Sequence, residues 1–210
     1  MNPLLTEISE TLQKGRAKQV KELVQKAIDE KIDAKSILED GLLAGMSVIG
    51  EKFKNNEVYV PEVLIAARAM NAGTELLKPL LGEAGAEKKG KVVLGTVKGD
   101  LHDIGKNLVA LMMKNYGFQV IDLGKDVAPQ EILDAVLRHH APAAGLSALM
   151  TTTVPAMQET IALLKEAPWC KVVVGGAVLN QEYADRIGAD RYAKDAMETI
   201  RYADKVDGAR

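Results

Sequence analysis

Several features that would assign this chain to a common class are missing from its sequence. It has one cysteine, Cys170, so no disulfide can form within the chain and we expect a reducing compartment. Its 27 Lys and Arg against 29 Asp and Glu leave no basic excess for nucleic acid. No apolar run approaches the roughly 20 residues of a membrane helix, and the first residues lack the pattern of a secretory signal. We therefore expect a cytoplasmic protein that binds neither nucleic acid nor membrane.

Two widespread ligand-binding motifs are also missing. The three histidines do not have the spacing of a zinc site. Five residues separate Gly99 from Gly105 where a phosphate-binding loop has four, and Asn107 stands in place of the hydroxyl that would hold magnesium. There is no Gly-x-Gly-x-x-Gly motif either, which makes nucleotide binding a weak alternative.

Residues 1–82 have the apolar spacing of helices throughout. Asp33 is expected to cap one of these helices, residues 55–57 to end it, and Pro61 to begin the next. The pattern predicts a four-helix bundle, with helices near 4–12, 17–28, 33–53 and 61–82. Residues 83–90 are small, charged and without periodicity, and are predicted to be a linker.

From Lys91 onward, expected strands and helices alternate. This alternation predicts a parallel sheet with helices on both faces for residues 91–210, a Rossmann-like (flavodoxin-like) doubly wound fold. The whole chain is thus expected to be α + α/β, a helical cap domain followed by an α/β domain. In such sheets ligands bind beyond the C-terminal ends of the strands. Strands are expected at 92–94, 119–123, 144–149, 172–174 and 191–193, and helices at 104–116, 129–140, 154–166, 180–186 and from about 195.

The loop after the first expected strand contains a histidine two residues after an aspartate. Asp100 can accept a hydrogen bond from the ring nitrogen of His102 that does not face a ligand. Such a carboxylate fixes the tautomer of a metal-bound histidine. Gly105 removes a side chain where a bulky group could enter. The alternative is a surface histidine beside an aspartate that caps a helix.

The ends of the third and fourth strands are rich in hydroxyls and glycine. Ser147 lies near the end of the third expected strand and residues 151–153 follow it, whereas Gly175-Gly176 follow the fourth. Each has an ordinary explanation, as a helix cap or a tight turn. Together with the first loop they predict a crevice with hydroxyls on one side and bare backbone on the other, which suits a large, flat-walled ligand tail.

The segment Asp100-Leu101-His102-Asp103-Ile104-Gly105 resembles the corrinoid-binding signature Asp-x-His-x-x-Gly. Ser147-x-Leu149 and Gly175-Gly176 match the other two parts of that signature, in order. The chain is similar to the cobalamin-binding module of methionine synthase. It is still more similar to the separate corrinoid proteins of methanol, methylamine and methoxyl-compound methyltransferase systems. The resemblance covers nearly the whole chain, including its helical half.

This resemblance implies a role for particular residues. His102 would replace the cofactor's own base as the lower ligand of cobalt, and Thr153 would extend the Asp100–His102 relay, where methionine synthase has serine. Phe53 and Val60 match residues that cover the upper face of cobalt, although both would also suit a protein core, and Val60 is smaller than the usual leucine. The residues implied to contact the lower face or the tail are Asp100, His102, Asp103, Gly105, Ser147, Leu149, Thr151, Thr153, Gly175 and Gly176.

The resemblance implies a non-catalytic carrier subunit that moves a methyl group on cobalt. The donor enzyme would be a substrate:corrinoid methyltransferase, the receiving enzyme a corrinoid:acceptor methyltransferase using tetrahydrofolate or a similar carrier, and a reductive activator would be a third partner. A cobalamin-sensing regulator is one alternative, but residues 1–82 contain no basic recognition helix. The cobalamin subunit of a mutase is another, and it would need a barrel domain on a second chain.

Overall fold

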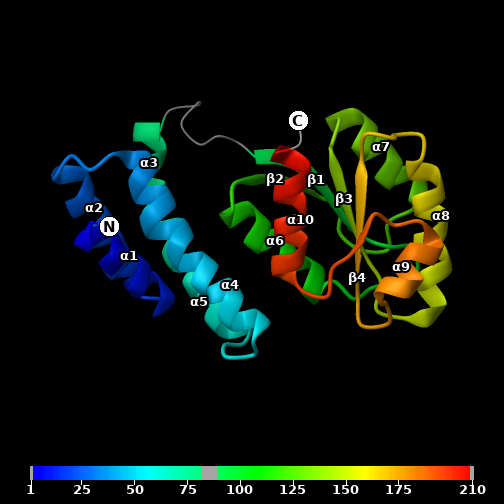
Figure 1. The fold of residues 1–210 in the computed structure, drawn as a ribbon, viewed down its shortest axis with the longest axis horizontal. Coiled ribbons are helices and arrows are strands. Elements are labelled where there is room, and N and C mark those ends of the chain that lie inside the picture. Colours follow the sequence, from blue (N-terminus) through cyan, green and yellow to red (C-terminus); the bar gives the residue numbers. More distant parts are fainter. Residues whose placement is uncertain (1, 82–88, 209–210) are drawn as a thin grey trace. The chain divides into compact units, whose positions relative to one another are not determined.

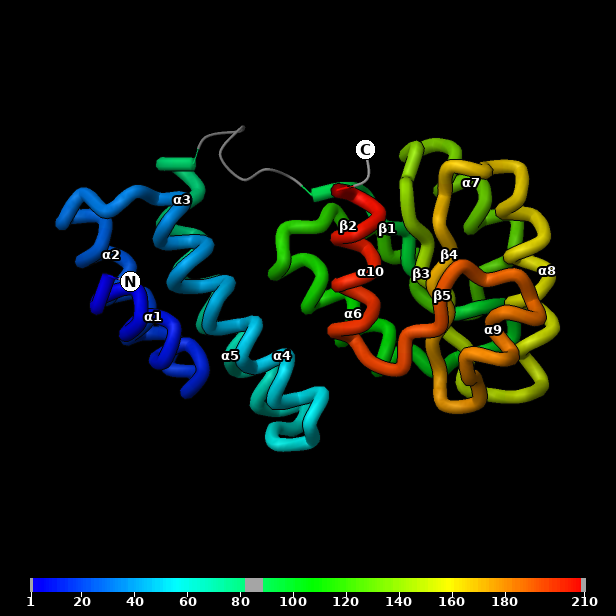
Figure 2. The backbone as a smooth tube through the Cα atoms, in the orientation of Figure 1, coloured from blue at the N-terminus to red at the C-terminus, as the bar shows by residue number. Residues whose placement is uncertain are grey.

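The structure is a computed structural model that describes residues 2–81 and 89–208. Its internal contacts divide the chain into two compact units. One comprises Met1–Lys88 with Asn115–Gly117, and the other comprises Lys89–Lys114 with Phe118–Arg210 (Figures 1 and 2). Residues 83–88 of the expected linker lie outside the described residues, so the domain boundaries drawn from the sequence stay a prediction.

The N-terminal unit is helical, as expected. Asp33 caps its third helical segment by accepting a hydrogen bond from the Ser36 N–H, and Asn56, with φ 60°, lies in the turn that follows that segment. Buried apolar side chains such as Ile8, Leu12 and Met46 fill the unit. The segments are α1 (Pro3–Gln13), α2 (Ala17–Asp29), the unbroken run α3 (Ala34–Ser36), η1 (Ile37–Leu43) and α4 (Ala44–Lys54), and α5 (Val60–Leu81).

One detail of this unit differs from the expectation of regular helices. Segment η1 is π-helical rather than α-helical. It packs against α1, and a Cβ at Gly41 of η1 would lie 3.2 Å from Ile8 Cγ2. Just after η1, a Cβ at Gly45 of α4 would lie 2.8 Å from the Ser9 carbonyl oxygen of α1. Apolar spacing does not report a contact between helices that are far apart in the sequence, so the π-helical segment was not predicted.

The C-terminal unit is a five-stranded sheet in which all neighbouring strands are parallel, in the order β2-β1-β3-β4-β5. This is the flavodoxin-like order, and it confirms the predicted fold class. Helices α6 and α10 cover one face of the sheet and α7, α8 and α9 cover the other (Figure 1). The elements are β1 (Lys89–Thr96), α6 (Ile104–Asn115), β2 (Phe118–Asp122), α7 (Pro129–His139), β3 (Ala143–Ser147), η2 (Thr151–Thr153), α8 (Val154–Leu164), β4 (Lys171–Gly175), α9 (Gln181–Ile187), β5 (Arg191–Tyr192) and α10 (Ala196–Gly208).

The first strand begins earlier than the sequence suggests. Lys89 and Gly90 were expected in the linker, but they are the first two residues of β1. Lys89 pairs with Phe118 of β2, and its ammonium lies over the Phe118 ring and forms an ion pair with Asp204 of α10. These contacts come from distant parts of the chain, which explains why local composition did not reveal the start of the strand.

The strand register aligns the ends of the three central strands. Thr96 of β1 pairs with Ser147 of β3, and Ser147 pairs with Gly175 of β4. The loops that follow these strands therefore leave the sheet at one level, at its C-terminal edge. The strand order reverses between β1 and β3, because β2 lies on one side of β1 and β3 on the other. This edge is the place to look for a ligand site.

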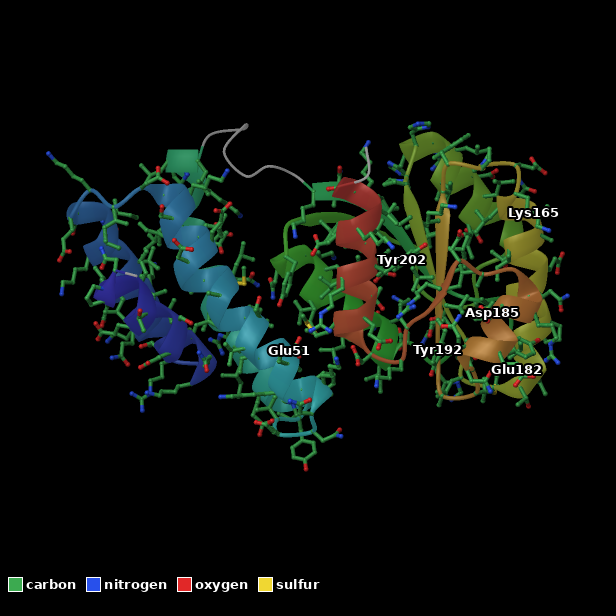
Figure 3. All side chains as sticks on the ribbon, in the orientation of Figure 1. Glu51, Lys165, Glu182, Asp185, Tyr192 and Tyr202 are labelled. Atoms are coloured by element: carbon green, nitrogen blue, oxygen red, sulfur yellow. The ribbon has the colours of Figure 1, made fainter. Side chains whose placement is uncertain are left out.

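The outer surfaces of α8 and α9 carry charged side chains. Lys165 at the end of α8, and Glu182 and Asp185 of α9, are exposed to solvent (Figure 3). The opposite sides of these helices are buried against the sheet, as in other amphipathic helices. No helix among the described residues is both long enough and apolar enough to span a membrane.

Candidate functional site

The site begins with a tight turn at the end of β1. The Asp100 N–H donates to the Val97 carbonyl oxygen at 3.0 Å, and Gly99 within the turn has φ 83°, a left-handed conformation that glycine adopts without strain. The chain then passes through His102 and enters α6 at Ile104. This turn brings the Asp100 side chain inside the protein and leaves His102 at the surface.

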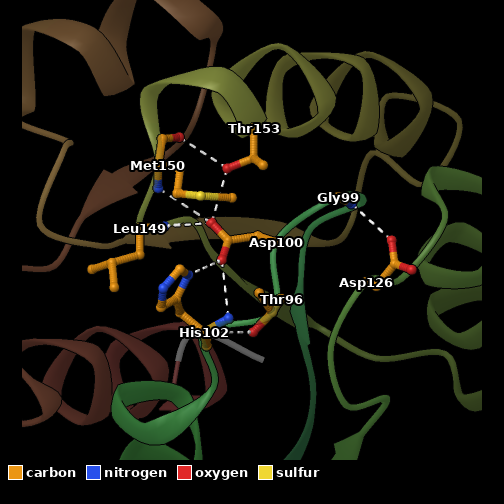
Figure 4. Close-up of polar contacts among 8 residues, drawn as sticks. All are labelled: Thr96, Gly99, Asp100, His102, Asp126, Leu149, Met150 and Thr153. Carbon is orange, nitrogen blue, oxygen red and sulfur yellow. Dashed lines mark hydrogen bonds and ion pairs between the residues drawn. The ribbon is translucent and has the colours of Figure 1, made fainter.

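Asp100 is fully buried, and both of its carboxylate oxygens accept hydrogen bonds (Figure 4). Oδ1 accepts from the His102 N–H at 3.0 Å and lies 2.7 Å from His102 Nδ1. Oδ2 accepts from the Leu149 N–H at 2.7 Å, the Met150 N–H at 3.3 Å and the Thr153 hydroxyl at 2.8 Å. A buried charge is tolerated when its lone pairs are satisfied in this way.

These hydrogen bonds also determine the charge of Asp100. Burial by itself raises the pKa of this carboxyl group, but the hydrogen bonds from His102, Leu149 and Thr153 outweigh burial and hold the pKa well below its ordinary value. Asp100 is therefore an ionised carboxylate at neutral pH, and an ionised carboxylate only accepts hydrogen bonds.

His102 is oriented by Asp100 with one ring nitrogen left for a ligand. Because Asp100 accepts, the favoured tautomer carries its proton on Nδ1, and Nε2 then offers a lone pair. The His102 side chain is 51% exposed, whereas Asp100 is completely enclosed. The Thr96 hydroxyl also donates to the His102 carbonyl oxygen at 3.3 Å. One side of the His102 ring is thus held by Asp100, and the other faces solvent.

Large apolar side chains near His102 are exposed to solvent. Leu101 is 62% exposed, Ile104 78% and Leu149 41%. Leu101 and Ile104 flank the histidine in sequence, and the Leu149 backbone is bonded to Asp100. Exposed apolar side chains gathered at one place are typical of a binding surface. The sequence analysis named Leu149 but missed Leu101 and Ile104, because the apolar positions of a signature look like core residues.

The three glycines expected to line the site serve different ends. A Cβ at Gly105 would meet no atom within 4 Å, so this position faces open space. A Cβ at Gly175 would lie 3.3 Å from the Ala193 carbonyl oxygen. Gly176 has φ 141°, and a Cβ there would come 1.8 Å from the Ala148 carbonyl oxygen. Gly176 is thus required by the close approach of two backbone segments.

The remaining predicted residues lie as follows. Ser147 ends β3 and is half-buried, Thr151 is exposed in η2, and Asp103 is half-buried just before α6. Phe53 and Val60 are half-buried in the N-terminal unit, on either side of the turn between α4 and α5. Their assignment to the upper face of a cofactor stays a prediction.

The structure also includes residues that sequence reasoning did not find. Thr96 and Met150 contact His102 and Asp100, and Asp126 accepts a hydrogen bond from the Gly99 N–H. Met150 acts through its backbone, which leaves no signal in the residue type. Thr96 and Asp126 belong to a strand and a loop outside the signature, so only the fold brings them to the site.

The donor set fits a metal that carries most of its own ligands. Among residues 2–81 and 89–208, no three His, Cys, Asp or Glu side chains gather to hold a metal ion. A single histidine nitrogen would suit a metal whose other positions are filled by a macrocycle, as in haem or a corrinoid. The open space at Gly105 and the exposed apolar side chains fit a large organic group beside that metal.

Comparisons with known proteins give the same answer. Residues 90–201 match one B12 binding domain family, and residues 4–78 match a second family with the same description. Dimethylamine corrinoid protein 1 of Methanosarcina acetivorans is 44% identical over 187 residues, which is 87% of each chain. A corrinoid protein of Desulfitobacterium hafniense is 40% identical over 98% of each chain.

Solved structures also resemble the chain. The methanol:cobalamin methyltransferase complex MtaBC from Methanosarcina barkeri contains a chain that is 31% identical, with a TM-score of 0.85 over 100% of this chain and 81% of that one. A cobalamin-binding protein from Desulfitobacterium hafniense is 31% identical, with a TM-score of 0.81 over 96% and 98% of the two chains. The fold, the histidine site and these relatives agree, and the chain belongs to the family of B12-binding corrinoid proteins.

Proposed function

We propose that the chain is a methyl carrier that holds cobalamin or a related corrinoid with His102 as the lower ligand of cobalt, the cofactor's own base being displaced. The observation that carries this proposal is the pairing of a fully buried, ionised Asp100 with a half-exposed His102 at 2.7 Å. A bound corrinoid supplies a metal that can receive a methyl group from one partner and give it to another.

The residues of the chain bind and orient the cofactor. Asp100 holds the imidazole in one tautomer and makes its free nitrogen more basic, which strengthens the bond to the metal. Thr153 and the backbone of residues 149–150 keep Asp100 in place. Leu101 and Ile104 present apolar surface at the rim, and Gly105 leaves room for the tail beside Ser147.

The partners follow from the carrier role. One matched structure is a methanol:cobalamin methyltransferase complex, which supports a substrate:corrinoid methyltransferase as the first partner. A corrinoid:acceptor methyltransferase and a reductive activator are the further partners that a corrinoid carrier would need. The role of Phe53 and Val60 as residues that would shield the cobalt between these encounters is part of this proposal and rests on the family resemblance.

The first experiment is a visible absorption spectrum after incubation with hydroxocobalamin and removal of free cofactor. Wild type is expected to retain the cofactor with a histidine-ligated, base-displaced spectrum, and His102→Ala is expected to lose that signature. His140→Ala is the matched control, because the His140 side chain is exposed at the end of α7, where its ring stacks on Trp169. A colourless wild-type protein would overturn the proposal.

A second arm compares methylcobalamin with adenosylcobalamin. A methyl carrier is expected to accept the methyl form and to pass its methyl group on when the acceptor enzyme is added. Strong preference for the adenosyl form, with no methyl transfer, would instead support a mutase subunit or a sensor.

A further inference from the structure

We propose that Asp126 is a positioning residue for His102: it holds the turn at Gly99 and thereby sets where the histidine presents its free nitrogen. This inference rests on the proposed function, since it takes His102 to be the ligand of cobalt. Asp126 itself lies outside the corrinoid signature, in the loop between β2 and α7.

Asp126 makes its contacts with the turn that precedes His102. Its backbone N–H donates to the Asp100 carbonyl oxygen at 3.0 Å. Its carboxylate Oδ1 accepts from the Gly99 N–H at 2.8 Å (Figure 4) and lies 3.4 Å from Lys98 Nζ. Asp126 therefore holds the turn through both its backbone and its side chain.

The backbone around Asp126 is suited to this task. Asp126 has φ 55°, in the left-handed region that aspartate, asparagine and glycine adopt more readily than other residues. The next residue, Val127, donates its N–H to the Thr96 carbonyl oxygen at 3.0 Å and forms a parallel bridge with Val97. The loop is thus fixed against the end of β1, so a contact from Asp126 is a contact from a rigid part of the sheet.

Asp100 connects Asp126 to the histidine. Its carbonyl oxygen is held by Asp126 and its carboxylate holds His102. If the Gly99 N–H loses its acceptor, the turn is free to move and the carboxylate moves with it. A plausible metal–nitrogen bond lies within about 0.2 Å of its usual length, so the position of the ring nitrogen matters. A loosened turn should therefore weaken histidine ligation even when the fold survives.

The hydrogen bond to Gly99 matters more than the ion pair. The side chains of Lys98 and Asp126 are 58% and 44% exposed, and exposed ion pairs contribute little. A backbone N–H bonded to a carboxylate is a stronger contact. This difference provides the control: removing Lys98 should be nearly silent, and removing the acceptor should not.

The test compares three variants with wild type. Asp126→Gly keeps the left-handed backbone but removes the acceptor, Asp126→Asn keeps both the backbone preference and an acceptor oxygen, and Lys98→Met removes only the ion pair. Two quantities are measured: the amide hydrogen exchange rate of Gly99 in the corrinoid-free protein, and the affinity for hydroxocobalamin in the histidine-ligated form. Thermal unfolding is recorded for all variants.

Asp126→Gly is expected to exchange the Gly99 amide faster and to lose about tenfold in histidine-ligated affinity. Asp126→Asn and Lys98→Met should stay within about twofold of wild type. Wild-type exchange and ligation in Asp126→Gly would overturn the inference. A lower melting temperature with unchanged ligation would also overturn it, since Asp126 would then only stabilise the fold.

The proposed function fails in a different way. If the spectrum of the loaded wild-type protein does not depend on His102, the carrier proposal is overturned and the positioning role falls with it. If histidine ligation is present in wild type and unaffected in Asp126→Gly, only the inference about Asp126 is wrong. The Gly99 exchange rate, measured without cofactor, reports on the turn in either case.

Discussion

Thr153 and Asp100 are 53 positions apart in the sequence, yet the Thr153 hydroxyl donates to the Asp100 Oδ2 at 2.8 Å inside the protein. The same hydroxyl lies 2.9 Å from the Met150 carbonyl oxygen, so it has two acceptors for one proton. When it donates to Met150, Asp100 keeps its bonds from the Leu149 and Met150 N–H groups. Thr153 is thus an adjustable member of the site, whereas the backbone donors are fixed.

Replacing Thr153 tests this adjustable contact. Thr153→Ser keeps the hydroxyl and should retain wild-type histidine ligation. Thr153→Val has nearly the same shape without the hydroxyl, and should cost about 1 kcal/mol of unfolding free energy. Chemical denaturation of the corrinoid-free protein gives this value. An equal loss in both variants would show that packing, rather than the hydroxyl, accounts for the effect.

Asp100→Asn probes the buried charge. An amide presents one acceptor oxygen where the carboxylate presents two, so some donors around residue 100 lose their partner, and we expect a loss of about 3 kcal/mol of unfolding free energy. His102 should also lose the fixed tautomer, which weakens ligation of hydroxocobalamin. A variant that binds the corrinoid with an unchanged spectrum would contradict the role given to Asp100.

Wild type and Asp100→Asn should also differ in how their stability depends on pH. The pKa of Asp100 is lower in the folded protein than its ordinary value of 3.8, so its ionised form stabilises the fold above that value and the stabilisation is lost as pH falls below it. As the pH falls below about 4, wild-type stability should therefore fall more steeply than that of Asp100→Asn. Parallel curves from acid denaturation would contradict this expectation.

Cys170 should be unreactive in the folded protein. Burial, and then the charge of Asp190, raises the pKa of this thiol to about 12. Since only the thiolate attacks a disulfide reagent, labelling at pH 8 should be slow in the native protein and complete in denaturant. Because the unfolded thiol ionises near its ordinary value of 9.0, the folded protein should also lose stability as pH rises above 9.0. Fast native labelling would show that the thiol is accessible.

Two glycine substitutions should have opposite effects. Gly176→Ala places a Cβ 1.8 Å from the Ala148 carbonyl oxygen at φ 141°, and should cost about 3 kcal/mol or more of unfolding free energy.

Gly105→Ala meets nothing within 4 Å and lies in the first turn of α6, so stability should be unchanged or slightly higher. Corrinoid affinity should fall in Gly105→Ala, since the methyl group occupies the space kept for the tail. Wild-type affinity in that variant would place the tail elsewhere.

Much of the fold was accessible from the sequence. The strands are short buried runs bounded by polar loops, so β2 and β4 begin or end within one or two residues of their predicted limits. The start of β1 at Lys89 and the π-helical η1 were missed, because both depend on partners far along the chain. Periodicity describes a segment's own environment and carries little information about which other segment meets it.

The site divides in the same way. The pairing of Asp100 with His102 spans two residues and was predicted from their spacing, and the structure has it at 2.7 Å. Thr153 was named only through the family resemblance. Asp126 and Thr96 were not found, since each reaches the histidine loop from another part of the sheet. The Met150 contact is made by a backbone N–H, which any residue type would supply.

Every group that orients His102, from Thr96 through Asp100 and Asp126 to Thr153, belongs to the C-terminal unit. The orientation of the histidine is therefore determined by contacts within the sheet and its loops. This makes the C-terminal unit self-sufficient in positioning its histidine. Joining it to a different helical domain would leave the contacts that orient His102 unchanged.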